Sequence, residues 1–181
     1  NCAIGVMIDD AVSLLPLSTH SDFMPSTLYA MDRELIAEAV YQGLPEHLKA
    51  EYSHLRSSQL MRAKLMRHEL DLSPNEQAVF VGQAAIDAYL DMPEEGFYVR
   101  SPKSFLGANG LRVEQIALFE DIVTLMMQHV KTLADTALNA KSLSSASHAV
   151  IGRPVNFQGI GGEDSNQQAE TILRLAATRS G

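Results

Sequence analysis

The strongest local candidate for phosphate chemistry is a glycine-rich loop, Gly159–Gly162, which lies between an apolar run and a helical pattern. Free amide groups at a helix N-terminus often hold phosphate oxygens. Glu163 and Asp164 stand at that N-terminus, however, where they would repel an anion while satisfying the helix dipole themselves. No Lys-Ser or Lys-Thr pair follows, as a P-loop requires. We therefore predict a connecting turn here, with phosphate binding as the alternative.

Other reactive side chains are isolated. Lys103 follows a β-favouring run at 97–100 and a Ser-Pro turn, and its local sequence alone indicates a surface charge. The six histidines show no His-Glu-x-x-His spacing and have no cysteine partner, so we predict no metal site. Cys2 is the single cysteine, which excludes an internal disulfide and favours a reducing, cytoplasmic setting. Because it lies in an apolar run at 2–8, we expect a buried structural thiol.

Composition excludes several classes of protein. The chain has 181 residues, of which 46% are hydrophobic and 20% charged, so it can build one core or two small ones. A net charge of −8 argues against a general nucleic-acid binder, and no apolar run approaches the ~20 residues of a membrane span. One basic cluster exists, and we interpret it as the solvated face of a helix. Its members are Arg56, Arg62, Lys64, Arg67 and His68.

The apolar pattern changes period along the chain. Two runs, 2–8 and 11–17, flank Asp9-Asp10 and predict a hairpin, and 26–30 predicts a third strand. Helical spacing then covers 31–43 and 46–70. Further elements are expected as a strand at 97–100, a helix at 112–140, a buried strand at 148–152 and a helix from 164.

These elements predict an α/β chain. We expect one mixed sheet built from 2–8, 11–17, 26–30 and 147–152, packed against the 164–179 helix. The 31–140 region is expected to form a mostly helical inserted subdomain around the long helix, with 141–181 returning to the first subdomain.

Six segments, taken in order, resemble the N-terminal lobe of the seventy-kilodalton heat-shock (DnaK-type) chaperones, which are actin-like ATPases. They are similar, respectively, to the end of the first phosphate motif, the Thr-Pro-Ser strand, Val-Gly-Gln-x-Ala, Lys-Arg-Leu-Ile-Gly, Val-x-x-Val-Pro-Ala-x-Phe and Gln-Arg-Gln-Ala. The matching segments here are 1–6, 24–30, 80–85, 101–107, 149–157 and 166–169. The sequence Ile-Gly-Arg-Pro-Val-Asn-Phe at 151–157 and the long 31–76 insertion resemble the bacterial YegD-like chaperones in particular.

The resemblance implies a partial actin-like (ribonuclease H-like) lobe and a site for MgATP. Lys103 matches the lysine that reaches the γ-phosphate, and Asn1 matches the last position of the phosphate loop. Pro154 matches the proline of the switch between domains, and Gln167 stands where the chaperones carry its arginine partner. Ser104 replaces another family arginine. The last two departures argue against classical coupling to a peptide-binding domain.

The remaining family motifs are expected outside this chain. Because the chain opens with Asn1 inside a strand-like run, we expect its start to be a cut, with the catalytic Asp before it and the second phosphate loop beyond Gly181. ATP and Mg are therefore expected to bind only in the full-length protein. The resemblance implies unfolded client proteins or a co-chaperone as partners. Two alternatives remain: a degenerate lobe whose 31–76 helices dock a partner protein, and a sugar kinase or phosphatase of the actin-like superfamily.

Overall fold

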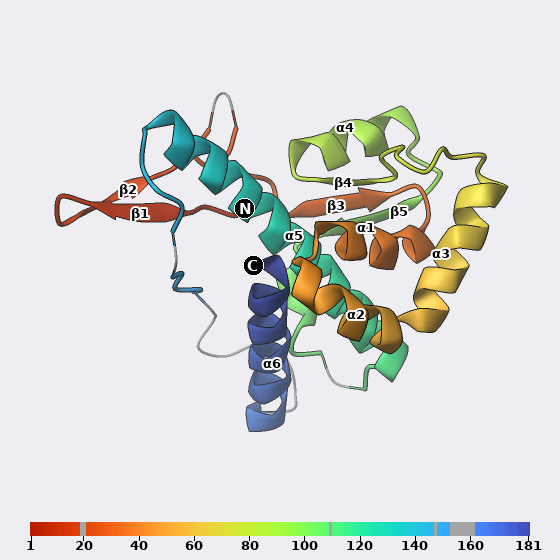
Figure 1. Cartoon of the computed structure of the whole chain (residues 1–181). Helices are drawn as coiled ribbons and strands as arrows, with labels where there is room; N and C mark the ends of the chain where they lie inside the picture. Colours follow the sequence, from red (N-terminus) through yellow and green to blue (C-terminus); the bar gives the residue numbers. More distant parts are fainter. Residues whose placement is uncertain (19–20, 109, 147, 153–161) are drawn as a thin grey trace.

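The computed structural model of the chain describes residues 1–18, 21–108, 110–146, 148–152 and 162–181, the side chains of the last range from Asn166 onward. It is a mixed α/β structure with two small antiparallel sheets (Figure 1). One is the hairpin β1 (Gly5–Ile8) and β2 (Ala11–Leu14), and the other has the order β4–β3–β5. Its strands are β3 (Thr27–Ala30), β4 (Val79–Val81) and β5 (Phe97–Arg100). The predicted α/β class is thus confirmed at this coarse level.

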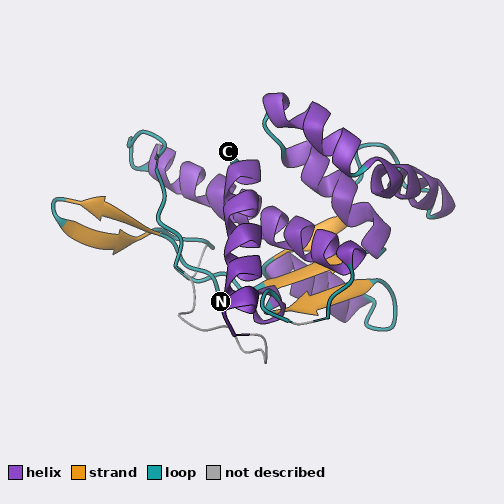
Figure 2. Ribbon diagram, turned by 90° about the horizontal axis from the view of Figure 1, so that it is seen from below, coloured by secondary structure: helices purple, strands orange, loops and turns teal. Residues whose placement is uncertain are grey.

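The hairpin turn forms where the acidic pair predicted it. Ile8 pairs with Ala11, which leaves only Asp9 and Asp10 in the loop, with φ angles of 48° and 63°. Positive φ at both positions defines the type I′ geometry, whose twist matches that of the flanking strands. The hairpin projects away from the helices (Figures 1 and 2). The buried strand predicted at 2–8 is therefore wrong, because its residues alternate between half-buried and exposed.

The predicted single mixed sheet is wrong in the described part of the chain. β3 pairs with β4 and β5 rather than with the hairpin, and every strand pair is antiparallel. Residues 148–152 form no strand, and Val150 is fully exposed there. A short apolar run lacks the length to specify a strand by itself, since a pairing partner must supply the backbone hydrogen bonds.

The helices in the first half of the chain surround the three-stranded sheet. They are a 3₁₀ turn η1 (Arg33–Leu35), α1 (Ile36–Gly43), α2 (Glu46–Leu55), α3 (Ser57–Glu69) and α4 (Gln83–Asp91). The predicted 46–70 helix is thus two helices that meet at Arg56. The main core contains Leu28, Ile36, Tyr52 and Ile122, which join the sheet, α1, α2 and the long helix α5 (Val113–Ala140).

The second half of the chain is dominated by two packed helices. A 3₁₀ turn η2 (Pro102–Phe105) leads to α5 (Val113–Ala140) and then α6 (Gly162–Ser180). Ile172 and Leu173 of α6 pack against Val123 of α5. We predicted that this last helix would lie on a sheet, and its apolar face instead covers α5. None of the helices in the described ranges is long and apolar enough to span a membrane.

Candidate functional site

The first candidate site lies where β3 begins, and four separate segments meet there. Cys2 exchanges backbone hydrogen bonds with Met24 at 2.8 and 2.9 Å, and its Sγ lies 3.3 Å from Ser26 Oγ. The Ser101 amide donates to the Ser26 carbonyl at 2.8 Å, which brings the end of β5 to the same place. The predicted buried thiol is half-buried. Ser26 thus connects the N-terminus to the turn that precedes Lys103.

The Val-Gly-Gln segment joins this group through the neighbouring residue. Thr27 Oγ1 donates to the Gly82 carbonyl at 2.8 Å, and the Gly82 amide donates to the Thr27 carbonyl at 3.0 Å. Gly82 has a φ of 71°, and a Cβ there would lie 2.7 Å from Met24 Cγ. Because only glycine tolerates both the conformation and the close approach, the glycine of this segment is required by packing.

Lys103 lies on a turn that is held by hydrogen bonds, and its side chain contacts Gly152. Ser101 adopts a left-handed conformation with a φ of 51°, and the Ser104 hydroxyl donates to the Ser101 carbonyl at 2.8 Å. The exposed Lys103 side chain donates from Nζ to the Gly152 carbonyl at 2.8 Å. That contact joins two segments 49 residues apart in the sequence, both of which the resemblance singled out.

The structure shows fewer contacts between the other predicted site residues and the segments that meet at Ser26. Asn1 is exposed and precedes the bridge formed by Cys2. Pro154 and most of the Gly159–Gly162 loop lie outside the described residues, so the switch role that the resemblance implies for Pro154 stays a prediction. Gln167 is exposed on α6, where its backbone carbonyl accepts a hydrogen bond from Thr171 Oγ1 at 2.9 Å.

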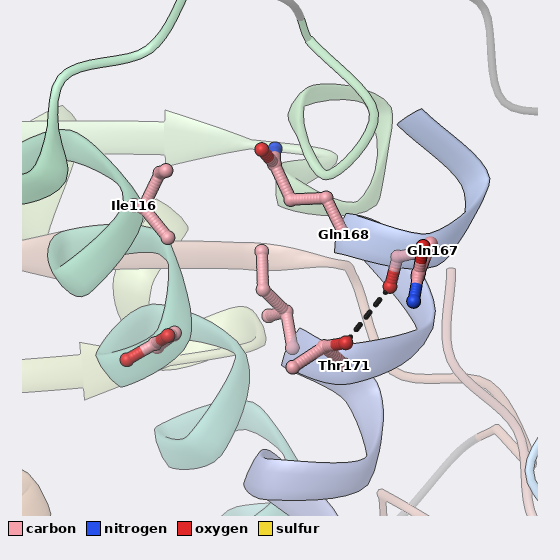
Figure 3. Close-up of a pocket in the computed structure, with 6 residues that line it drawn as sticks. Ile116, Gln167, Gln168 and Thr171 are labelled. Atoms are coloured by element: carbon pink, nitrogen blue, oxygen red, sulfur yellow. Dashed lines mark hydrogen bonds between the residues drawn. The ribbon is translucent and has the colours of Figure 1, made fainter. Parts of the chain in front are cut away.

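The adjacent Gln168 has a role that sequence reasoning missed. Its Nε2 donates to the Leu106 carbonyl at 3.1 Å and thereby attaches α6 to the segment that follows Lys103. Gln167 and Gln168 also line a shallow hollow of about 290 Å³ between α5 and α6 (Figure 3). Ile116 and Thr171 line it too, and neither Lys103 nor Asn1 does. The only available signal was that Gln168 belongs to the same matched motif as Gln167.

A second group of functional side chains is a buried ion-pair network. Arg56 Nε donates to Asp121 at 3.0 Å, and Arg56 Nη2 donates to Glu120 at 2.5 Å. Arg179 from α6 reaches Asp121 at 3.4 Å. Both guanidinium groups lie near the ring of buried Tyr52, at 5.9 and 5.1 Å from its centroid. The network therefore holds the α2–α3 junction, α5 and α6 together.

Burial raises the pKa of Asp121, whereas its interactions with Arg56 and Arg179 lower it. Burial by itself would lower the pKa of Arg56, but the Asp121 and Glu120 carboxylates raise it above its ordinary value. Burial also raises the pKa of Tyr52, so the phenol stays neutral. The assignment of Arg56 to a solvated helix face is wrong, because its partners lie 64 and 65 residues away and no local spacing reveals them.

Among the described residues, no group of three or more His, Cys, Asp or Glu side chains could hold a metal ion. No protein-family model matches the chain, and no solved structure matches it significantly.

Proposed function

We propose that this chain is a lobe of a DnaK-like, actin-like ATPase that binds and hydrolyses ATP in the full-length protein and acts as a chaperone or chaperone-like switch. The observation that carries the proposal is the meeting of segments around Ser26. Four of the six matching segments are 1–6, 24–30, 80–85 and 101–107, and each of the other three contacts 24–30 through Met24, Ser26 or Thr27. This convergence supports the proposal, because motifs that serve one ligand must lie close together in space.

The residues present fit MgATP in part. Lys103 supplies an exposed ammonium on a turn whose backbone is held at both Ser26 and Ser104. A preorganised cation of this kind stabilises charge that develops on a phosphoryl group during transfer. Its hydrogen bond to the Gly152 carbonyl fixes the direction of the side chain. The exposed Asn1 can contribute its backbone at the same end of β3. MgATP itself supplies the reactive phosphoryl group and the metal.

The test is single-turnover hydrolysis of ATP by the full-length protein at saturating MgATP. Lys103→Ala should lower the rate by about 100-fold, because loss of one preorganised group typically costs ~3 kcal/mol of transition-state stabilisation. Nucleotide affinity should fall less, since other groups hold the phosphates in the ground state. Lys141→Ala, which removes an exposed lysine at the end of α5, is the matched control. Equal rates for wild type and Lys103→Ala would leave Lys103 a surface charge and remove the proposal's main support.

We further propose that residues 1–181 bind MgATP weakly or not at all by themselves. An actin-like site closes two lobes on its ligand, and this chain carries Lys103 and Asn1 but none of the other expected phosphate or adenosine motifs. Calorimetric titration of the chain with MgATP should show no saturable binding at micromolar concentrations. Micromolar affinity would contradict this and would point back to the Gly159–Gly162 loop.

A second candidate function is a protein-binding module with little or no ATPase activity. Exposed apolar side chains on the 31–76 helices favour it: Leu55, Met61, Leu65 and Leu70 are 42–66% exposed. A full-length protein that is folded but does not hydrolyse ATP would favour this candidate over the ATPase.

A further inference from the structure

Lys103 lies in a short segment that has little internal support. We define the Lys103 segment as residues 101–108, which contain η2 and the residues that flank it. The hydrogen bond that closes the turn, from the Leu106 amide to the Lys103 carbonyl, is long at 3.4 Å. Because 3₁₀ turns have poor hydrogen-bond geometry, a turn of this kind is weakly stable alone. The position of the Lys103 ammonium therefore depends on contacts that hold the segment from outside.

Apolar contacts hold the Lys103 segment against two helices. The Phe105 ring stacks on Phe119 of α5, with ring centroids 5.5 Å apart. Leu106 is completely buried and packs against Ile172 of α6. Apolar packing is not directional, so these contacts keep the segment in place without fixing the orientation of its backbone.

A directional contact comes from Gln168, whose side chain extends from α6 to this segment (Figure 3). Its Nε2 donates to the Leu106 carbonyl at 3.1 Å and lies 3.5 Å from the Ala108 carbonyl oxygen. A primary amide carries two N–H donors, so one glutamine can serve both carbonyls. Because both carbonyls belong to the backbone that follows η2, this contact sets the orientation in which the chain leaves the turn.

The helix α6 gives Gln168 a fixed base. The next residue, Ala169, has no exposed surface, and Ile172 is 1% exposed. At the far end of the helix, Arg179 reaches the buried Asp121 carboxylate at 3.4 Å. Because α6 is attached to α5 at both of these places, the hydrogen bond from Gln168 ties the Lys103 segment to a helix that is itself held.

We propose that Gln168 is a positioning residue for Lys103: it orients the backbone from which the ammonium projects and does not itself contact ATP. Lys103 Nζ donates to the Gly152 carbonyl at 2.8 Å, and that contact fixes the end of the side chain only while its backbone is held. A displacement of about 1 Å at a reacting site can lower the rate about 100-fold. The inference rests on the proposed function and adds to its site a residue 62 positions from Leu106.

The test is a double-mutant cycle in the full-length protein, measured as single-turnover ATP hydrolysis at saturating MgATP. Gln168→Met keeps the length of the side chain and removes the donor, and Gln168→Glu keeps the shape and replaces the donor with an acceptor. Either change should lower the rate about tenfold, through partial displacement of the ammonium. Nucleotide affinity should stay within about twofold, because the side chain does not contact the ligand. In the Lys103→Ala background neither change should lower the rate further.

A second measurement reports on the Lys103 segment without nucleotide. Amide hydrogen exchange within 101–108 should become about fivefold faster in Gln168→Met, the factor that corresponds to the loss of one typical hydrogen bond. Exchange in the central strand β3 should stay unchanged. The matched control is Arg174→Met, which alters an exposed arginine of α6 that pairs with Glu170. It should change neither the hydrolysis rate nor the exchange within 101–108.

An equal loss of rate in the wild-type and Lys103→Ala backgrounds would mean that Gln168 only stabilises the fold, and would overturn the proposal. An unchanged rate, or unchanged exchange within 101–108, would overturn it too. These results leave the proposed function standing as long as Lys103→Ala by itself lowers the rate. If Lys103→Ala hydrolyses ATP as fast as wild type, the proposed function fails, and the role of Gln168 fails with it.

Discussion

The two sheets of this protein have similar strands and opposite surroundings. In β3 every residue is buried, and Leu28 has no exposed surface. In the β1–β2 hairpin Met7 and Val12 face each other across the strands and are 65% and 71% exposed. Both sets of strands are short, apolar and antiparallel. The difference lies in what covers them.

The elements that pack against a strand, and so bury it, are not specified by the strand's own sequence. β3 is the central strand, paired on both edges, with α4 packed against it and with α1 and α5 contributing to its core. The hairpin is anchored only near its base, where Ile4 and Val6 contact Leu15 and the end of α5. A two-stranded hairpin is marginally stable alone. We therefore expect the two sheets to respond very differently to substitution.

The largest effect is expected at the buried network that borders the core of the three-stranded sheet. Arg56→Ala should lower the free energy of unfolding by about 3–5 kcal/mol, because it leaves Asp121 buried without its main partner. Chemical denaturation measures this change. Arg174→Ala is the control, since that arginine makes an exposed i, i+4 pair with Glu170 and should change little. A small effect of Arg56→Ala would mean that the core does not depend on the network.

A direct comparison of the two sheets follows from Leu28 and Met7. Leu28→Ala should cost about 2–5 kcal/mol, because it removes a fully buried side chain and leaves a cavity. Met7→Ala should cost less than about 0.5 kcal/mol, because that side chain is already in solvent. Urea denaturation of both variants measures the difference. Comparable losses would show that the hairpin face is covered in solution and would break the comparison.

The smallest effect is expected at the hairpin turn. Asp10 holds a φ of 63°, so Asp10→Gly should relieve the left-handed conformation and stabilise the hairpin by less than about 1 kcal/mol. Amide hydrogen exchange should then slow in β1 and β2 while global stability stays constant. If Asp10→Gly raised global stability, the hairpin would belong to the cooperative core.

Local patterns predicted much of the fold. Asp9-Asp10 between apolar runs was enough for the hairpin, because a two-residue loop needs residues that tolerate positive φ. The i, i+3, i+4 stripe of α5 was enough for a helix at 113–140. The 46–70 helix was predicted as one because Arg56 is compatible with a helix interior. It is two helices that meet at Arg56, whose backbone departs from helical geometry (φ −109°, ψ 23°) and whose side chain contacts carboxylates on α5.

The candidate site was predicted one segment at a time. Lys103, Gly82 and the 24–30 strand were singled out from sequence, but their contact through Ser26 and Thr27 was not. The contact of Gln168 with the Leu106 carbonyl was not predicted, because a hydrogen bond to a distant carbonyl has no local signature. The predicted strand at 148–152 is wrong for a related reason, because a strand forms only where another strand supplies its backbone hydrogen bonds.

The sequence by itself determined the hairpin turn, most helix positions and the absence of an internal disulfide. These features depend on contacts within a few residues, such as backbone φ at Asp9 and Asp10 or the repeating apolar face of α5. Only the tertiary structure decided which strands pair, which strands are covered, and which cations are free. Arg56 and Lys64 belong to one basic cluster in the sequence, yet one is buried against Asp121 and the other faces solvent. Burial and ion pairing depend on residues more than 60 positions away, so no local pattern can contain them.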